Sequence, residues 1–208
     1  MLLGAGCLLC EGRHGPVCAP CAARLPRAGP LSLDDPPARA LLRYEGAGRE
    51  LVTCLKYRNG RPLVRPLGRL LADLAGDVDA ELVTWVPASP AGRRHRGFDQ
   101  GRLLARAMAR PAGLGVAGLL RRGPGPSQTG RPAADRRRGP ALTAPRSGPG
   151  RVIVVDDVIT TGSTLRVAAM ALRGAGWRPV LGLSVAATPR RHPDPHRPPP
   201  AHRVGDRP

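Results

Sequence analysis

Two adjacent carboxylates, Asp156 and Asp157, are the residues of this chain whose pairing most directly suggests chemistry. They follow the run 151–155, whose mostly β-branched apolar residues predict a strand buried on both faces of a parallel sheet. Apolar residues at helical spacing then predict a helix over 163–175. The residues between acids and helix, which carry hydroxyls or are glycine, therefore lie at a predicted helix N-terminus: Thr160, Thr161, Gly162, Ser163 and Thr164.

Phosphate is the ligand that this predicted loop suits, because unpaired N–H groups and the helix dipole attract an anion and glycine allows close approach. The two acids need hydroxyl donors or a hydrated cation beside them, since adjacent buried carboxylates repel each other and lose hydration. A sugar diol with Mg²⁺ nearby would meet that need, so the two features together predict a ribose 5-phosphate site. The alternative is an ordinary turn in which Ser163 or Thr164 caps the helix and the acids are solvated.

A second group of charged residues follows the strand predicted over 82–86. Arg93, Arg94 and Arg96 crowd a predicted loop that Gly97 closes. Clustered guanidinium groups repel one another unless an anion binds them, and their planar fork suits phosphate oxygens. Pyrophosphate is therefore a plausible ligand. The alternative is a solvated basic loop, because arginine is abundant throughout the chain.

Four cysteines near the start form two C-x-x-C pairs: Cys7 with Cys10, and Cys18 with Cys21. Such pairs bring four thiolates together on Zn²⁺, and so short a segment has no apolar core of its own. We expect a structural zinc in a small ribbon-like module over residues 1–30, with His14 as a bystander. The alternatives are two disulfides or a redox C-x-x-C pair. The fifth cysteine, Cys54, is expected to be a buried, inert thiol.

Composition adds a net charge of +18 and a pI near 11.6, which would ordinarily indicate a polyanionic partner. However, 32 of the 33 basic residues are arginine and only Lys56 is lysine, a bias typical of a GC-rich genome, so the charge is weak evidence. No run reaches transmembrane length and no signal peptide is recognisable, so we expect no membrane insertion and a cytoplasmic location. Residues 189–208, rich in Pro, Arg and His, are expected to be a disordered tail.

Strands alternate with helices along residues 38–188, which predicts a doubly wound, mostly parallel α/β sheet with its site at the carboxyl ends of the strands. Residues 25–37 look like a Pro-rich linker, and no Walker or dinucleotide-binding motif is present in context. The remaining predicted strands are 38–44, 116–120 and 180–185, and the remaining predicted helices are 48–57, 63–74 and 103–108.

The stretch VIVVDDVITTGST closely resembles the 5-phosphoribosyl 1-pyrophosphate (PRPP) loop of type I phosphoribosyltransferases. P-x-x-P followed by R-x-R-G-F-D-Q resembles the signature of the ComF family, whose loop would face the pyrophosphate of PRPP, although Asp99 stands where that family usually has Asn. The phrase LKYRNGRPL resembles a Lys-Tyr-x-Gly segment of the same family. The resemblance covers residues 7–188 and implies a structural cysteine knuckle. It also implies a mobile loop that closes over PRPP, with Gln128, Arg136 and Arg137 in it.

Two functions follow from this resemblance. The first is Mg²⁺-dependent transfer of phosphoribosyl from PRPP to a nitrogen acceptor. Asp156 and Asp157 would hold the ribose, and the arginine cluster would stabilise the departing pyrophosphate; no residue stands out as a general base. The second is a ComF-like factor that handles single-stranded DNA with competence-machinery proteins during DNA uptake and keeps PRPP as a ligand. Single-strand binders usually interleave aromatic residues for stacking, and this chain has few.

Overall fold

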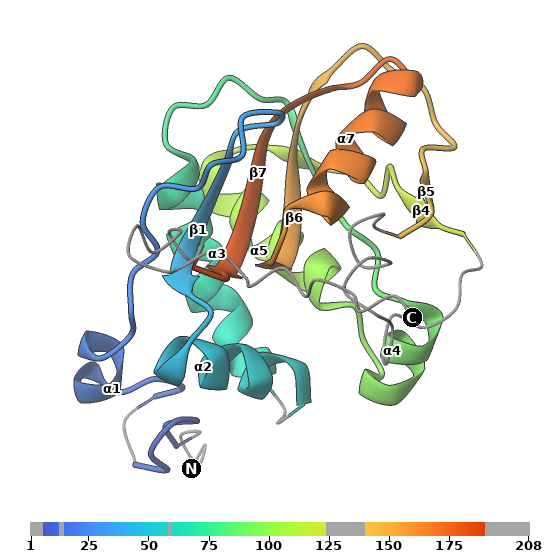
Figure 1. Ribbon diagram of the computed structural model, residues 1–208. Helices are drawn as coiled ribbons and strands as arrows, with labels where there is room; N and C mark the ends of the chain where they lie inside the picture. The colour runs from blue at the N-terminus through green and yellow to red at the C-terminus, as the bar shows by residue number, and fades with distance from the viewer. Residues whose placement is uncertain (1–5, 13–14, 58–59, 124–139, 190–208) are drawn as a thin grey trace, which may run out of the picture.

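A computed structural model of the protein describes residues 6–12, 15–57, 60–123 and 140–189. Its centre is a five-stranded sheet in which every neighbouring pair of strands is parallel. The predicted doubly wound α/β class is therefore confirmed. In spatial order the strands are β1 (Ala38–Arg43), β7 (Arg178–Ala187), β6 (Arg151–Ile159), β2 (Leu82–Trp85) and β3 (Gly115–Val116) (Figure 1).

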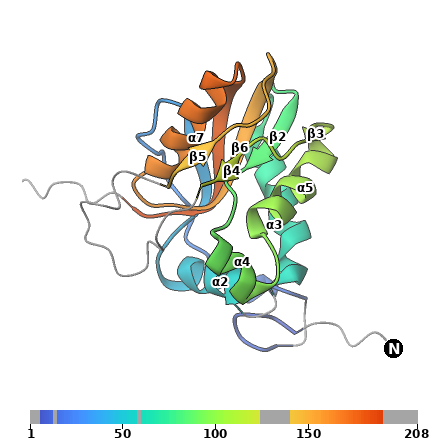
Figure 2. The ribbon, with the colours of Figure 1, turned by 90° about the vertical axis from the view of Figure 1, so that its right-hand side faces the viewer.

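Helices cover both faces of this sheet. The helix α7 (Ser163–Gly174) packs on one face, while α3 (Arg61–Ala75) and α5 (Gln100–Ala112) pack on the other (Figure 2). Below them, α2 (Gly46–Tyr57) packs against α3 and joins the same core. Helices α3 and α5 approach closely at Gly68, where an added Cβ would lie 2.4 Å from the Cβ of Ala107.

The central strand β6 contributes to both cores because its side chains alternate between the two faces. Val152 and Val154 pack with α7, whereas Ile153 and Val155 pack with α3 and α5, and all four are at most 1% exposed. The predicted two-sided burial of this strand is thus confirmed. The strand is longer than expected, since it stays paired with β7 through Ile159. The two acids therefore lie within the strand near its end.

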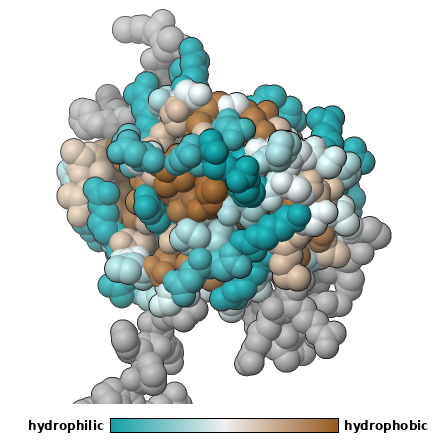
Figure 3. Space-filling model, turned by 90° about the horizontal axis from the view of Figure 1, so that it is seen from above, coloured by the Kyte–Doolittle hydropathy of each residue, from teal (hydrophilic) through white to brown (hydrophobic). Residues whose placement is uncertain are grey.

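The order of the strands creates a crevice between β2 and β6. From β2 the chain passes through α5 to β3 on one side, whereas from β6 it passes through α7 to β7 on the other. Ligands of doubly wound sheets bind where the winding reverses, at the carboxyl ends of the strands. Asp156 and Asp157 lie at this position. Figure 3 views the molecule from the opposite end, where hydrophilic side chains surround a hydrophobic patch.

The loop predicted around Arg93 is wrong, since these residues form the helix α4 (Pro90–Arg96). Ser89 caps it by accepting a hydrogen bond from the Gly92 N–H at 3.1 Å, and Gly97 ends it in the left-handed region at φ 72°. Serine followed by proline is a helix-start pattern that the sequence analysis did not use.

The strand predicted over 116–120 is also wrong, because only Gly115–Val116 pairs with β2. Gly118 then lies against the indole of Trp85, and the Leu119 N–H donates to Thr84 Oγ1 at 3.3 Å, so the chain turns away from the sheet. Beyond this turn, β4 (Arg121–Arg122) pairs antiparallel with β5 (Leu142–Thr143).

The expected linker 25–37 has structure of its own. Its first part lies along the outer edge of β1, where the Ala28 N–H donates to the Leu41 carbonyl at 3.1 Å and the Arg43 N–H to the Pro26 carbonyl at 2.8 Å. A short helix, α1 (Ala19–Ala23), precedes it. No helix of the described residues is both long and apolar enough to cross a bilayer. The tail predicted over 189–208 lies, except for Pro189, outside the described residues.

Candidate functional site

Asp156 and Asp157 both lie half-buried at the carboxyl end of β6. Asp156 accepts a hydrogen bond from the Asp157 N–H at 2.8 Å. Burial raises the pKa of Asp156 to about 7, and the neighbouring charge of Asp157 acts in the same direction. The site therefore contains a carboxyl group whose ionisation is costly until a cation or hydroxyl donors reach it.

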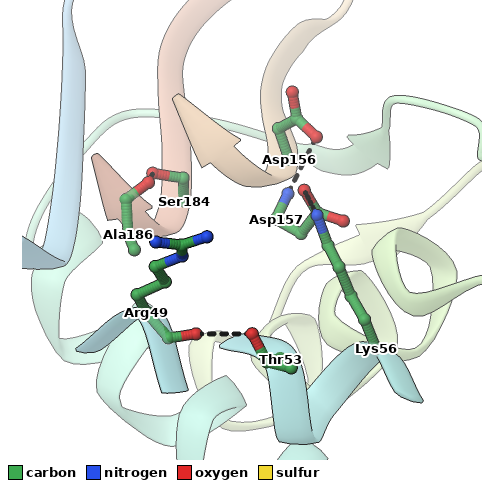
Figure 4. Close-up of polar contacts among 7 residues, drawn as sticks. All are labelled: Arg49, Thr53, Lys56, Asp156, Asp157, Ser184 and Ala186. Carbon is green, nitrogen blue, oxygen red and sulfur yellow. Dashed lines mark hydrogen bonds and ion pairs between the residues drawn. The ribbon is translucent and has the colours of Figure 1, made fainter. Parts of the chain in front are cut away.

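Lys56, at the end of α2, lies beneath the acids. Its Nζ is 3.0 Å from Asp157 Oδ1, and the two side chains are 20% and 23% exposed (Figure 4). Burial lowers the pKa of Lys56, but the charge of Asp157 and the hydrogen bond to it outweigh burial, so the pKa is raised overall. Sequence analysis did not place Lys56 in the site. Its being the one lysine among 33 basic residues was the signal that could have found it.

A cavity of about 240 Å³ opens beside the two acids. Lys56 and Thr164 line it together with Asp156 and Asp157. Its other wall comes from the α4–α5 segment and from β4, with the nitrogen-bearing side chains Arg96, Gln100 and Arg122.

That second wall carries donors that have no partner among the residues the structure describes. Gln100 is only 1% exposed, and its Nε2 has no hydrogen-bond partner among the described residues. The Nε atoms of Arg96 and Arg122 are buried and equally unpartnered. Buried donors without acceptors are costly in folded proteins, so these three nitrogen atoms suit a ligand with acceptor oxygens. The cavity thus presents carboxylates on one side and N–H donors on the other.

The loop between β6 and α7 contains a glycine in a backbone conformation that other residues rarely adopt. Gly162 has φ 76°, and a Cβ there would lie 2.4 Å from a methyl group of Leu33, so only glycine fits. Gly162 is itself the N-cap, and no side chain caps the helix. The alternative in which Ser163 or Thr164 is the N-cap is therefore wrong. The Thr161 hydroxyl donates to Ser163 Oγ at 3.0 Å and accepts from the Ser163 N–H at 3.3 Å.

The structure divides the predicted loop residues between two cavities. Thr164 faces the acid-lined cavity, whereas Thr160 and Thr161 line a separate cavity of about 450 Å³ under residues 27–33. The arginine cluster is divided as well. Arg96 lines the acid-lined cavity, Arg93 lines a third one, and Arg94 is exposed and lines none of the three.

Asp99 has a structural role that the sequence did not reveal. Its carboxylate caps α5 by accepting from the Arg102 N–H at 3.2 Å, and it also accepts from the Ala88 N–H at 3.2 Å. It therefore holds the end of β2 against the start of α5. The predicted mobile-loop residues Gln128, Arg136 and Arg137 lie outside the described residues.

The four N-terminal cysteines converge as predicted. Their sulfur atoms all lie within 4.8 Å of one another, none forms a disulfide, and Cys10 and Cys18 are 3.6 Å apart. A tetrahedral Zn²⁺ with bonds of about 2.3 Å requires sulfur separations of about 3.8 Å. The Cys18 N–H donates to Cys7 Sγ at 3.4 Å and helps to lower the pKa of Cys7 to about 6, whereas the neighbouring thiol of Cys18 helps to raise the pKa of Cys21 to about 12. The cluster fits a zinc ion.

Cys54 stands apart from this cluster. It is fully buried, as predicted, and its thiol donates to the Leu8 carbonyl at 3.2 Å. This contact ties the cysteine segment to α2.

No protein-family model matches the chain, and no curated protein matches it. Among solved structures it is similar to an allosteric regulatory enzyme of purine biosynthesis, with TM-score 0.47, 25% identity, and 68% of this chain and 31% of that one covered. It is also similar to the glutamine PRPP amidotransferase from B. subtilis in complex with ADP and GMP, with TM-score 0.47, 25% identity, and 68% of this chain and 32% of that one covered. For an adenine phosphoribosyltransferase from Thermoanaerobacter pseudethanolicus the TM-score is 0.40 and the identity 16%, with 62% of this chain and 82% of that one covered. The chain spans 31% and 32% of the length of the first two proteins.

We expect about one zinc per chain in protein purified without chelator, because four thiolates at tetrahedral spacing bind this metal tightly. Elemental analysis of wild type, Cys10→Ser and Cys54→Ala measures this. Cys10→Ser is expected to lose most of the metal, while Cys54→Ala, which alters a thiol outside the cluster, keeps it. Wild-type protein with well under one zinc per chain would contradict the assignment.

Asp156→Asn is expected to gain stability over wild type as pH rises in Mg²⁺-free buffer. With its pKa near 7, folded Asp156 keeps a proton that the unfolded chain loses near pH 4, so wild-type stability falls between these values. Asparagine removes this dependence and keeps the oxygen that accepts from the Asp157 N–H.

The difference in Tm between Asp156→Asn and wild type, measured at pH 5 and pH 8, tests this. Asp73→Asn, an exposed acid on α3, is the matched control and should show no such trend. A difference that is constant or shrinks with pH would show that Asp156 ionises freely.

Proposed function

We propose that this protein binds PRPP with Mg²⁺ in the acid-lined cavity and belongs to the ComF-like phosphoribosyltransferases. The observation that carries the proposal is the pairing of two half-buried carboxylates with unpartnered nitrogen donors across one cavity at the winding reversal of the sheet. PRPP has both kinds of group, because its ribose hydroxyls suit the acids and its pyrophosphate suits the donors. The loop motif that resembles the PRPP loop supports the same ligand.

Each part of the cavity has a role in this proposal. Asp156 and Asp157 accept hydrogen bonds from the ribose hydroxyls. The loop 160–164 holds the 5-phosphate at the start of α7, where Thr164 is the loop residue that lines the cavity. Arg96 and Arg122 bind the pyrophosphate and stabilise its charge when the bond to the sugar breaks. The carboxylate oxygens of the two acids are ligands of the kind Mg²⁺ prefers, and the ion supplies further charge neutralisation when bound.

The remaining parts of the proposal concern the rest of the chain. Residues 1–30 would be a structural zinc module, residues 38–188 the phosphoribosyltransferase-like domain, and residues 189–208 a tail. The loop carrying Gln128, Arg136 and Arg137 would close over bound PRPP, and Arg93 and Arg94 would add positive charge near the entrance. A cytoplasmic location accords with four reduced cysteines.

Calorimetric titration with PRPP and Mg²⁺ tests the site. Wild type is expected to bind, and Asp157→Asn to bind at least about tenfold more weakly, because a charged hydrogen-bond partner is worth roughly 1.5–3 kcal/mol. Asp73→Asn carries the same charge change on an exposed surface and should bind as wild type does. Absence of PRPP binding by the folded wild type would refute the proposal.

Pyrophosphate release from PRPP across a panel of bases and amines then separates an enzyme from a binding protein. Turnover with one acceptor that Asp157→Asn abolishes would identify a transferase. Binding without turnover on any acceptor would leave a PRPP-binding protein and contradict the transferase part of the proposal.

A second candidate function is the handling of single-stranded DNA during DNA uptake, as in the ComF competence factors. The net charge of +18 and the ComF-like sequence motif around Arg96 favour this function. Fluorescence anisotropy with a labelled oligonucleotide at several salt concentrations is the measurement, and affinity is expected to fall steeply with salt. Negligible binding near physiological salt would remove this candidate.

A further inference from the structure

A third cavity, of about 710 Å³, lies next to the acid-lined one. The two share part of their walls, including Asp99 and Arg122. The groove runs from the end of β2 along the outer side of α5 to β4. It is too large for the pyrophosphate of PRPP alone, and the proposed function uses only Arg93 and Arg122 of its lining.

Arginine dominates the lining of this groove. Five guanidinium side chains face it, and none of them takes part in an ion pair within the described residues. Asp99 is the one acid in the lining, and its carboxylate is occupied by two backbone N–H groups. The five arginines are Arg93, Arg102, Arg106, Arg121 and Arg122.

Arg122 is the arginine of this groove whose surroundings are the least favourable for its charge. Burial lowers its pKa against the opposing charges of Asp156, Asp157 and Asp99, and its buried Nε has no hydrogen-bond partner among the described residues. An anion that enters the groove would offer this Nε an acceptor. Arg102 and Arg106 stand four residues apart on α5 and therefore point the same way. Their spacing suits a chain of phosphates rather than a single one.

The groove also has an apolar part, formed by Trp85, Phe98, Leu103 and Leu120. Arg61 lies 5.1 Å from the centre of the Phe98 ring, in a cation–π contact. Apolar and aromatic side chains beside convergent charged groups are typical of pockets for ligands that combine a planar ring with phosphates.

We propose that this arginine-lined groove is a second binding site, for a nucleoside polyphosphate. Its phosphates contact Arg102, Arg106 and Arg122, and its base packs on the wall of Trp85 and Phe98. Because the groove shares Arg122 with the acid-lined cavity, a ligand there would lie next to bound PRPP. The groove is lined by residues other than the acidic pair, and Arg122 is the one side chain that both proposals place against a ligand.

Calorimetric titration of the full chain with ATP at 150 mM salt tests this site. Wild type is expected to bind, and the double variant Arg102→Gln with Arg106→Gln is expected to bind at least about tenfold more weakly. The control is Arg65→Gln with Arg69→Gln, an exposed pair with the same spacing on α3, which should stay within about twofold of wild type. Inorganic tripolyphosphate is expected to bind more weakly than ATP, because it lacks the base.

Asp157→Asn separates this proposal from the proposed function. It should weaken PRPP binding and should not weaken ATP binding by more than about twofold, because removing a negative charge near Arg122 does not disfavour a phosphate. The proposal is overturned by any of four results: no ATP binding, equal loss in the α3 control, ATP binding lost in Asp157→Asn, or binding of a single-stranded oligonucleotide at this groove without binding of ATP.

Discussion

Two adjacent, half-buried carboxylates in the central strand impose the main electrostatic constraint on the site. Asp156 and Asp157 belong to β6, which is paired on both sides and buried on both faces up to the first acid. Two negative charges at this depth are unfavourable alone, as the raised pKa of Asp156 shows. Lys56 compensates one of them through its contact with Asp157, and the other remains for a ligand or cation. The carboxylates that are unfavourable alone are therefore the groups that the proposed ligand would neutralise.

The surrounding elements make this arrangement possible. The reversal of winding between β2 and β6 leaves a crevice at the acids, and Asp99 and Ser89 fix the helices that form its far wall. Helix α2 supplies Lys56 from below, and it is tied to the cysteine segment through Cys54. Disruption of the cysteine cluster would therefore affect the site indirectly, through α2.

The features that could be predicted from the sequence are those that depend on local patterns of residues. The buried strand, the helix after the glycine loop and the cysteine cluster all depend on residues close together in the chain. The helix α4 was missed because its arginines were interpreted as a loop, although Ser89 and Pro90 mark its start. Lys56, Gln100 and Arg122 were missed as site residues for a different reason. They reach the cavity from separate elements, and only the packing of α2, α5 and β4 around β6 brings them together.

The single lysine of the chain offers the most direct test of the central claim, that the acid-lined cavity is the PRPP site. In protein labelled with ¹⁵N-lysine, one side-chain ammonium signal reports on Lys56 beside Asp157. Titration with PRPP and Mg²⁺ is expected to shift this signal in a saturable way, because the charge and hydration around Asp157 change on binding. A signal that stays in place at saturating PRPP and Mg²⁺ would contradict the account.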